Sequence, residues 1–398
     1  MAITMTKGQA GLTGNTAIAY GMRQVNPDVC AAYPITPSTG VIEEFSSFVA
    51  DGAVDTELIT VESEHSAMSA CVGASAAGAR VMTATSSQGL ALMWEMLYIA
   101  SGLRLPIILT DVNRALSAPI NIHCDHSDSM GARDSGCIQL YSETVQEAYD
   151  NLIQAVRIAE DKRVLLPVMV CLDGFITSHA IENITLLEDE EVRRFIGEYR
   201  AAHPLLDTDN PVTYGALSLA DTYINFKHQQ SQAMAGAKEV AVEVAKEFAS
   251  KFGREYGLID TYMLEDADEV VVVLNSAAGT TRVAVDELRK AGRKVGMLRP
   301  RLFRPLPYTE IAEALKGAKS VAVLDRSDSM NGFGGPVFNE VRSSLYDLDA
   351  RPKVMSRIYG LGGRDYKVKD AVEVFDELAK ITSTGRVDTL LKYITLEE

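Results

Sequence analysis

The sequence has few cysteines and no paired cysteine motif. Its five cysteines are an odd number, and no two of them form a C-x-x-C pair. This pattern argues against a disulfide framework, and against a zinc or iron–sulfur site built by this chain alone. We interpret the cysteines as small buried apolar residues. If the protein works with metal clusters, we expect them in other chains, and we predict no metal site in this one.

Long hydrophobic runs and a basic surface are also missing. No continuous apolar run reaches membrane-spanning length, and the first residues, M-A-I-T-M-T-K-G-Q-A-G, lack the basic and apolar regions of a signal peptide. We therefore expect a cytoplasmic protein that does not enter a membrane. The net charge of −16 disfavours nucleic-acid binding, because contact with phosphates needs a basic surface.

A phosphate-binding loop is the third absence. Neither G-x-x-x-x-G-K nor G-x-G-x-x-G occurs in the chain. The turn T-A-T-S-S-Q-G at 83–89 follows a strand pattern and offers hydroxyl and backbone N–H groups to a polar ligand. We therefore expect that this chain does not hold a diphosphate in the usual way.

Short apolar runs alternate with helical patterns through the first 180 residues. Helical patterns such as 65–77 and 89–101 separate the apolar runs, and the runs lie at 29–33, 57–61, 79–83, 106–110 and 165–172. Buried strands that alternate with helices are typical of a parallel sheet covered on both faces. We therefore predict an α/β domain at 1–180.

The pattern changes after residue 180. A polar, acidic stretch at 183–211 is followed by a long helical pattern at 225–252. A second α/β unit then follows, with a helix at 279–291 that Gly292 ends and with strand patterns at 269–274, 294–298 and 320–324. We divide the chain into the α/β domain at 1–180, a linker with a connecting helix at 181–266, and a second α/β domain at 267–398.

The loop Y-P-I-T-P-S at 33–38 comes directly after a strand pattern. Open α/β sheets bind ligands at the carboxyl ends of their strands. Pro34 and Pro37 restrict the backbone, so Thr36 is expected to present its hydroxyl rigidly to a carboxylate or a carbonyl. Hydroxyls at 38 and 39 could cap the following helix. The alternative is a rigid turn with a cap, and the residues alone leave both interpretations open.

Two carboxylates, Glu62 and Glu64, stand at the start of a helical pattern rich in small residues. Glu64 follows a strand pattern closely enough to point into a cleft. The alternative is that these carboxylates interact with the helix macrodipole, which is the better interpretation for at least one of them. His65 by itself is more often a structural histidine than a catalytic one.

Arg114 lies a few residues past another strand pattern. An arginine at the carboxyl end of a strand can bind a substrate carboxylate through two N–H groups. Four possible metal ligands follow it, His123, Asp125, His126 and Asp128. Their spacing lacks the helical i, i+4 arrangement of a zinc protease. We favour a loop that becomes ordered around a ligand.

Taken together, these stretches resemble the pyruvate:ferredoxin oxidoreductase family, in particular the α subunit of its multi-subunit members. Each motif is weak by itself, but their ordered set is specific. The motifs are Y-P-I-T-P-S-T (33–39), E-S-E-H-S-A (62–67), N-R-A-L-S-A-P-I-N-I (113–122), D-H-S-D-S-M-G-A-R-D-S-G (125–136), Q-E-A-Y-D (146–150), D-G-F-I-T-S-H (173–179) and G-L-G-G-R-D (360–365). The resemblance implies a pyrimidine-type thiamine-diphosphate-binding domain, followed by a domain like the C-terminal domain of transketolase.

The resemblance also implies the reaction and the partners. Family members reversibly convert a 2-oxoacid and coenzyme A into an acyl-CoA and CO2 in anaerobic metabolism, and the electrons pass to ferredoxin. Thiamine diphosphate is shared with a β chain, which supplies the diphosphate and Mg²⁺ side of the site. The [4Fe–4S] clusters lie in partner chains, which include γ and ferredoxin-like δ subunits.

Residue roles follow from the resemblance in the same way. Glu64 aligns with the glutamate that hydrogen-bonds N1′ of the pyrimidine, and Thr36 and Arg114 align with residues that contact the substrate. Further cofactor contacts are expected from Pro34, Ile35 and Ser87. Thr36 and the segment N-R-A-L-S-A-P-I favour pyruvate, and they leave 2-oxoisovalerate and oxalate as alternatives.

Other interpretations stay open at this point. A hydrolase could use Ser38 with His65 or His126, but no G-x-S-x-G motif is present. A non-catalytic scaffold subunit is a further alternative. The run R-P-R-L-F-R at 299–304 is either a basic patch for another subunit or coenzyme A, or a structural turn.

Overall fold

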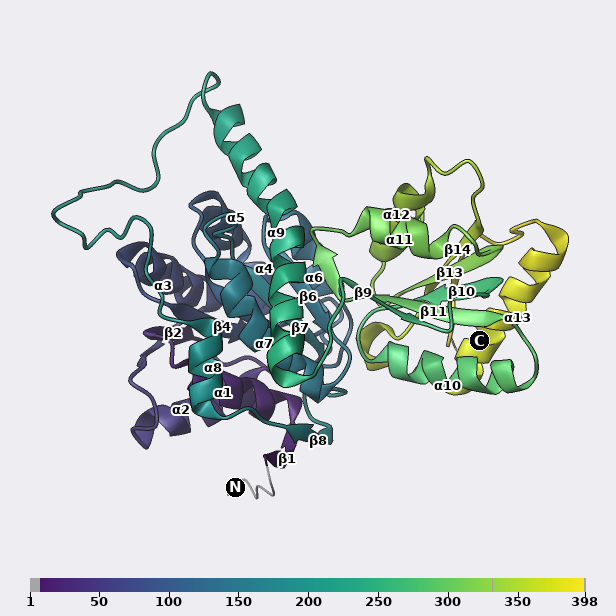
Figure 1. Ribbon diagram of the computed structural model, residues 1–398, viewed down its shortest axis with the longest axis horizontal. Helices are drawn as coiled ribbons and strands as arrows, with labels where there is room; N and C mark the ends of the chain where they lie inside the picture. Colours follow the sequence, from purple (N-terminus) through teal and green to yellow (C-terminus); the bar gives the residue numbers. More distant parts are fainter. Residues whose placement is uncertain (1–7, 331, 397–398) are drawn as a thin grey trace.

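The computed structural model describes residues 8–330 and 332–396 and shows two lobes (Figure 1). The extreme N-terminal stretch, where we expect no signal peptide, lies mostly outside the described residues. Within the described ranges, no helix combines the length and the apolar character needed to cross a membrane.

The first lobe is built on a sheet of seven strands in the order β12-β6-β7-β5-β4-β2-β3. All pairs in it are parallel except β12 with β6. The strands are β2 (Val29–Ala32), β3 (Glu57–Thr60), β4 (Val81–Thr85), β5 (Ile108–Asn113), β6 (Ile138–Ser142), β7 (Val168–Asp173) and β12 (Leu302–Arg304). The predicted parallel α/β sheet is therefore confirmed.

Helices cover both faces of this sheet, because the central strands are apolar on both sides. One core cluster joins the sheet to α1 (Gly14–Val25), α2 (Thr39–Ala50) and α7 (Val145–Glu160). The other joins it to α3 (Glu64–Ala77), α4 (Ser87–Leu92) and α5 (Trp94–Gly102). The structure divides the single helix predicted at 89–101 into α4 and α5. A small antiparallel pair, β1 (Gln9–Thr13) with β8 (Ile181–Thr185), and the short helix α8 (Asp189–Ile196) complete this lobe.

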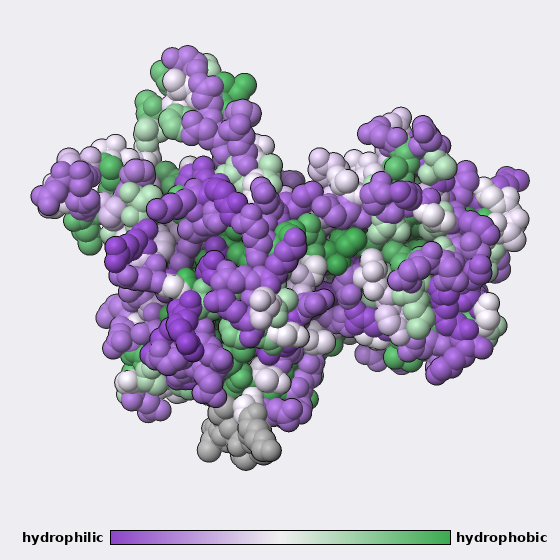
Figure 2. Space-filling model, in the orientation of Figure 1, coloured by the Kyte–Doolittle hydropathy of each residue, from purple (hydrophilic) through white to green (hydrophobic). Residues whose placement is uncertain are grey.

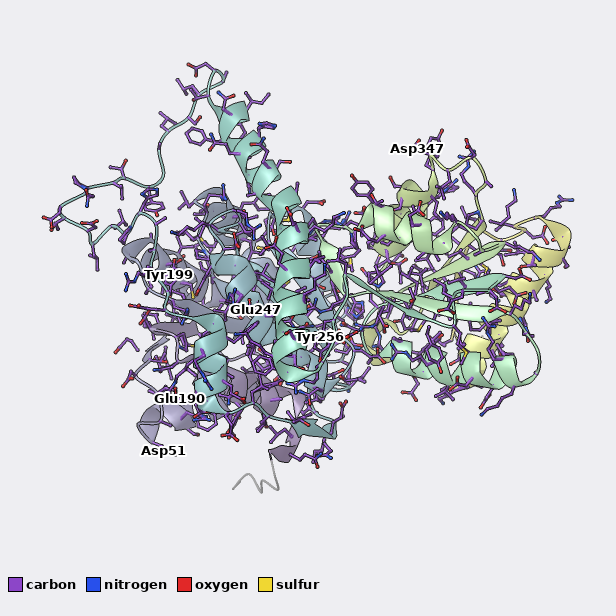
Figure 3. The ribbon with its side chains drawn as sticks, in the orientation of Figure 1. Asp51, Glu190, Tyr199, Glu247, Tyr256 and Asp347 are labelled. Carbon is purple, nitrogen blue, oxygen red and sulfur yellow. The ribbon has the colours of Figure 1, made fainter. Side chains whose placement is uncertain are left out.

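The predicted long helix is present as α9 (Tyr223–Phe252). Its second half packs on α7, where Arg157 pairs with Glu247 at 3.0 Å, and Tyr256, just past its end, donates a hydrogen bond to Asp150 at 2.6 Å (Figure 3). Its first half projects from the body together with the preceding loop (Figure 1). Apolar side chains are exposed on this projection, including Leu217 at 89% (Figure 2).

The second lobe has a sheet of six strands in the order β15-β14-β13-β10-β11-β9. The strands are β9 (Ile259–Tyr262), β10 (Glu269–Val272), β11 (Val295–Pro300), β13 (Ser320–Asp325), β14 (Lys353–Ile358) and β15 (Leu391–Tyr393). Helices α10 (Ala277–Lys290) and α13 (Val368–Thr384) pack on one face, and α11 (Tyr308–Leu315) and α12 (Pro336–Leu345) pack on the other.

The two lobes exchange backbone between them. Strand β12 leaves the second lobe and adds an antiparallel edge to β6 of the first sheet. Strand β9, from the stretch expected to be a linker, pairs with β11 in the second sheet. The division of the chain at residues 180 and 267 stays our interpretation, and these two strands cross it.

The segment 299–304 is not an exposed basic patch. Arg299 is buried, and its Nη2 lies 3.0 Å from Glu147 of α7. Arg301 is buried as well, and its Nε donates to Asn151 at 2.8 Å. Of the two interpretations left open for this run, the basic contact surface does not apply to these two arginines, because they stabilise the junction between the lobes from inside.

Candidate active site

Four predicted site residues lie on loops or at helix starts at one edge of the first sheet. Thr36 follows β2, Glu64 follows β3, Ser87 follows β4 and Arg114 follows β5. Since these strands are parallel neighbours, their carboxyl ends meet at the same edge. The topology therefore brings these four loops together.

Glu64 begins α3, whose N-cap Ser63 accepts a hydrogen bond from the Ser66 N–H at 3.2 Å. The Glu64 side chain is only 6% exposed, and no described residue donates a hydrogen bond to its carboxylate. Glu62 is exposed and bonded to the Ser66 hydroxyl. The carboxylate of Glu64 is therefore open to a ligand in a largely buried position, which makes Glu64 the better candidate of the two for binding one.

Gly89 of α4 was missed as a site residue by the sequence analysis. A Cβ atom at this position would lie 2.8 Å from Glu64 Oε1 and 2.3 Å from Thr85 Oγ1. Thr85 Oγ1 and Ser86 Oγ are buried and have no hydrogen-bond partner among the described residues. The glycine therefore makes room beside the glutamate, next to two further unpaired polar atoms. Its only sequence signal was its place at the end of the polar turn at 83–89.

Ser87 does not present its hydroxyl to this space. The residue is fully buried, its hydroxyl donates to the Ala115 carbonyl at 2.5 Å, and its N–H donates to Asp128 at 3.0 Å. In the structure, Ser87 joins the loops after β4 and β5. Its predicted contact with a cofactor stays a prediction.

Arg114 and Thr36 are brought into contact. Arg114 Nη1 donates to the Thr36 carbonyl at 2.9 Å, and Nε donates to the Asn121 carbonyl at 2.9 Å. The contact uses the backbone of Thr36 and not the hydroxyl that the sequence analysis emphasised. Burial lowers the pKa of Arg114, while the nearby charge of Asp128 opposes that shift. A guanidinium stays protonated under such shifts, so the site holds a fixed positive charge.

The rest of the loop after β2 lies at the surface. Pro34 and Thr36 are exposed and Ile35 is half-buried. Ser38 is buried, and its hydroxyl donates to the Ile35 carbonyl at 2.8 Å, so it does not cap α2. The predicted cap at residue 38 is therefore wrong, because the hydroxyl closes the loop on itself.

Two buried carboxylates lie beneath Arg114. Asp128 accepts hydrogen bonds from the backbone N–H groups of Ser87 and Arg114, and the amide of Asn113 joins it to Asp111. Burial raises the pKa of Asp128 to about 6. Burial and the charge of Asp128 raise the pKa of Asp111 well above its usual range. These hydrogen bonds fix the loop after β4 and the loop after β5 relative to each other.

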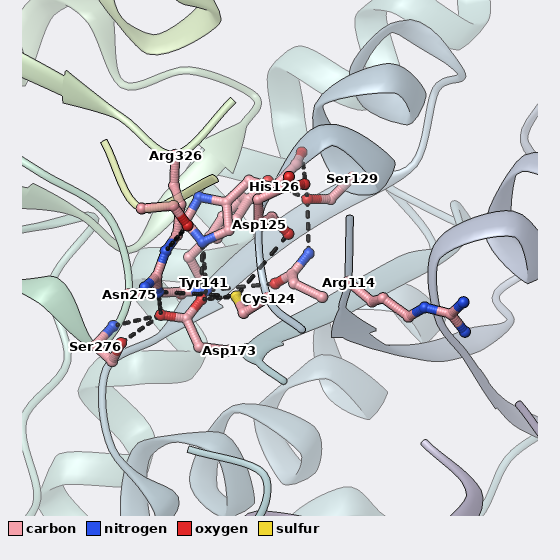
Figure 4. Close-up of polar contacts among 12 residues, drawn as sticks. Arg114, Cys124, Asp125, His126, Ser129, Tyr141, Asp173, Asn275, Ser276 and Arg326 are labelled. Atoms are coloured by element: carbon pink, nitrogen blue, oxygen red, sulfur yellow. Dashed lines mark hydrogen bonds and ion pairs between the residues drawn. The ribbon is translucent and has the colours of Figure 1, made fainter. Parts of the chain in front are cut away.

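Asp173, at the end of β7, is the centre of a buried network between the lobes (Figure 4). Its carboxylate lies 2.8 Å from His126 Nε2 and 3.0 Å from Arg326 Nη1, and it also accepts hydrogen bonds from Asn275 and Ser276. Burial would raise the pKa of Asp173, but the opposing effects of His126 and Arg326 lower it far below its usual range. Asp173 is therefore an ionised carboxylate that joins the lobes.

Cys124, His126 and Asp173 place possible metal ligands within 4.8 Å of one another. Arg326 adds a guanidinium at the same carboxylate, and a fixed positive charge there opposes cation binding. We interpret the cluster as an ion-pair network. Among the other possible ligands of the loop, His123 is exposed, Asp125 accepts hydrogen bonds from Ser127, and Asp128 binds the loops after β4 and β5. The absence of a metal site in this chain stays a prediction.

The residues of the hydrolase alternative are not assembled. The Ser38 hydroxyl is bonded to a carbonyl, His65 lies 3.5 Å from Glu95, and His126 is bonded to Asp173. The structure brings neither histidine to this serine within hydrogen-bond reach, which a serine nucleophile requires.

Two family models match the chain. One is described as "Pyruvate flavodoxin/ferredoxin oxidoreductase, thiamine diP-bdg" and matches residues 20–246, and the other as "Pyruvate:ferredoxin oxidoreductase core domain II" and matches residues 267–371. Together they cover most of the chain.

Similar curated proteins cover nearly the whole chain. A pyruvate synthase subunit PorA of Thermotoga maritima is 55% identical over 93% of this chain and 94% of its own length. The PorA subunit of Methanocaldococcus jannaschii is 50% identical over 93% and 94%. A ketoisovalerate oxidoreductase subunit VorA of Pyrococcus horikoshii is 43% identical over 97% and 98%.

A solved structure shares the fold. It is a 2-oxoglutarate:ferredoxin oxidoreductase from Magnetococcus marinus with 2-oxoglutarate, coenzyme A and succinyl-CoA bound, and its TM-score is 0.72 at 22% identity. The similarity covers 93% of this chain and 65% of that chain. A split-gene transketolase, described as an inactive β4 tetramer, matches with a TM-score of 0.56 at 11% identity over 94% of this chain and 99% of its own.

Proposed function

The chain belongs to the pyruvate:ferredoxin oxidoreductase family, and on that premise we propose that it is the α subunit of a pyruvate synthase. The enzyme converts pyruvate and coenzyme A into acetyl-CoA and CO2, reversibly, and passes the electrons to ferredoxin. The identities of 55% and 50% are both to pyruvate synthase subunits and favour pyruvate, while other pyruvate synthase subunits at 44–45% are about as similar as ketoisovalerate oxidoreductase subunits at 43–45%. The same chemistry on 2-oxoisovalerate is the second candidate.

The observation that carries this proposal is the fixed guanidinium of Arg114. Two of its nitrogens are held by the carbonyls of Thr36 and Asn121, and Nη2 makes no hydrogen bond with any described residue. The side chain extends away from the Asp173 network (Figure 4). A guanidinium oriented in this way binds the carboxylate of a 2-oxoacid without further ordering, and misplacement by about 1 Å can cost about 100-fold in rate.

The residues around Glu64 fit the pyrimidine end of thiamine diphosphate. Glu64 is largely buried and its carboxylate accepts from no described residue, Gly89 leaves space beside it, and the buried hydroxyls of Thr85 and Ser86 have no partner among the described residues. When bound, thiamine diphosphate supplies the electron sink that decarboxylation of a 2-oxoacid needs. In our proposal Glu64 holds a proton on the pyrimidine, while Pro34 and Ile35 border the ring and help to exclude water.

Other parts of the enzyme belong to partner chains in this proposal. The sequence has no phosphate-binding loop, and its five cysteines are all buried and free. We assign the diphosphate and Mg²⁺ side of the cofactor to a β subunit. The [4Fe–4S] clusters belong to partner chains that include γ and ferredoxin-like δ subunits, and the complex works in the cytoplasm with external ferredoxin.

The test is viologen reduction by the complex purified anaerobically with its partner chains. We expect coenzyme A-dependent reduction with pyruvate to exceed that with 2-oxoisovalerate, 2-oxoglutarate and oxalate. Replacing the glutamate by its amide, Glu64→Gln, is expected to lower kcat by about 100- to 10,000-fold, the range for losing a general acid or base. The matched control is Glu62→Gln, because Glu62 is an exposed neighbour on the same turn.

The outcomes separate the parts of the proposal. Preference for another 2-oxoacid would keep the mechanism and replace the substrate. Full turnover in Glu64→Gln, or an equal loss in Glu62→Gln, would refute the role of Glu64. A complex that uses no 2-oxoacid would refute the function itself.

A further inference from the structure

The motif G-L-G-G-R-D at 360–365 has no part in the function proposed above. It follows β14 in the second lobe and includes the tight turn Leu361–Gly363. This turn nevertheless contacts the segment of the first lobe that holds Arg114. The contact crosses between the lobes close to the proposed substrate site.

The turn is docked on residues 121–125 by three hydrogen bonds. Asn121 Nδ2 donates to the Gly362 carbonyl at 2.9 Å, the Gly363 N–H donates to the Cys124 carbonyl at 2.7 Å, and the Gly362 N–H donates to Asp125 at 3.3 Å. Because donors and acceptors come from both sides, the two segments constrain each other in direction as well as in distance.

The same contact requires glycine for two separate reasons. Gly362 and Gly363 have φ values of +59° and +83°, which L side chains rarely adopt. A Cβ atom on Gly362 would also lie 2.4 Å from Asn121 Nδ2, and one on Gly363 would lie 2.4 Å from the Cβ of His123. The turn can approach the loop this closely only without side chains.

Asn121 connects this turn with Arg114 through two hydrogen bonds. Its carbonyl accepts the hydrogen bond from Arg114 Nε at 2.9 Å, while its side-chain amide is the group bonded to Gly362. The Ala115 N–H, next to Arg114, also donates to the His123 carbonyl at 3.0 Å. One residue therefore touches the second lobe with its side chain and the guanidinium with its backbone.

We propose that Gly362 is a positioning residue for substrate binding. Through Asn121 it fixes the direction in which Arg114 presents its guanidinium to the substrate carboxylate. The inference rests on the proposed function, in which Arg114 binds a 2-oxoacid. It gives the second lobe a part in substrate affinity, in addition to packing.

The test compares KM values in the complex purified with its partner chains. Gly362→Ala is expected to raise the KM for pyruvate about tenfold, the effect of weakening one hydrogen bond to a charged group, and to leave the KM for coenzyme A unchanged. The matched control is Gly385→Ala, because Gly385 has a similar φ of +69° in the same lobe, but apart from its chain neighbours no described residue lies within 4 Å of its Cβ position. This control is expected to keep the wild-type KM for pyruvate.

A second variant, Asn121→Ala, removes the Nδ2 atom with which the methyl group of Gly362→Ala would clash. In the double variant Asn121→Ala with Gly362→Ala, the KM for pyruvate is expected to equal that of Asn121→Ala alone, because both changes act on one contact. If Gly362→Ala does not assemble, Asn121→Asp decides, since it keeps the size of the side chain but has no amide to donate to the Gly362 carbonyl. It is also expected to raise the KM for pyruvate.

An unchanged KM for pyruvate in Gly362→Ala or Asn121→Asp would overturn the inference. So would an equal rise for pyruvate and coenzyme A, or fully additive effects in the double variant. Failure of the proposed function is a different result, in which the wild-type complex oxidises no 2-oxoacid at all.

Discussion

Buried aspartates in this protein carry different charges because their neighbours differ. Asp173 accepts from His126 and Arg326, and the electrostatic effects of these two neighbours keep its pKa low despite burial. Asp111 forms no ion pair with a described residue, its Oδ1 has no hydrogen-bond partner in the described part of the chain, and burial and the charge of Asp128 raise its pKa. We infer that Asp111 holds a proton in the folded protein, while Asp128 accepts the surrounding N–H groups.

This inference predicts a pH-dependent effect of Asp111→Asn. A carboxyl whose pKa is raised on folding stabilises the native state at low pH and loses that contribution as pH rises through the folded pKa. The stabilising contribution of Asp128 is lost between its ordinary pKa of 3.8 and its folded pKa of about 6. The pKa of Asp111 is raised well above its usual range, so its contribution is also lost as pH rises. The asparagine keeps an acceptor for Asn113 and carries no charge. The Tm of Asp111→Asn minus that of the wild type is therefore expected to increase from about pH 4 to about pH 7.

Thermal denaturation at several pH values measures this difference. Asp347→Asn is the control, because Asp347 is exposed in the second lobe (Figure 3). A difference in Tm that stays constant with pH for Asp111→Asn would show that Asp111 titrates in the same way in the folded and unfolded chains.

At the scale of elements, β12 shows how the two lobes are connected. This strand pairs with β6 at the edge of the first sheet. The side chain of Arg301, the residue before β12, contacts Asn151 of α7. Arg301 Nη2 donates to Gln154 at 3.0 Å, in addition to the bond from Nε to Asn151. Burial lowers the pKa of Arg301 to about 10, which still leaves it charged at neutral pH.

Removing this guanidinium is expected to destabilise the protein. In Arg301→Met the acceptors of Asn151 and Gln154 lose their donor, and each buried unpaired group costs about 1–3 kcal/mol. We expect a loss of about 2–4 kcal/mol in the free energy of unfolding, measured by urea denaturation. Arg351→Met, at an exposed arginine, is the control and is expected to change it little. Equal stability of both variants would show that backbone pairing alone holds β12.

At the scale of the whole molecule, the chain is one part of an enzyme in our proposal. It offers a fixed guanidinium and a glutamate that accepts from no described residue, but its cysteines are buried and its sequence has no phosphate-binding loop. Its projecting helix and loop expose large apolar side chains such as Leu217 and Phe226. Catalysis by the chain alone would lack both the diphosphate site and the electron acceptor.

We therefore expect the chain purified alone to reduce no viologen with pyruvate and coenzyme A and to contain no iron or labile sulfide. The complex with its partner chains is expected to contain both and to be active. Elemental analysis and the viologen assay on the same samples check this. Iron bound in stoichiometric amount by the isolated chain would contradict the assignment of the clusters to partners.

The sequence by itself determined the local elements and the family. Apolar periodicity predicted the parallel strands and the long helix α9, because period and length are local properties of the chain. The ordered motifs indicated the family before any fold was known. They also named Glu64 and Arg114 as candidates, since polar residues that follow buried strands gather at one edge of a parallel sheet.

Only the tertiary structure decided which of these groups meet and in what surroundings. The letters R-P-R-L-F-R indicate charge but not burial, so the sequence left a surface patch and a structural turn open for Arg299 and Arg301, and the structure shows both arginines buried. The contact of Gly362 with Asn121 joins residues 241 positions apart, which no local pattern encodes. Thr36 meets Arg114 through its carbonyl, a group that every residue carries, so the sequence could not indicate that bond.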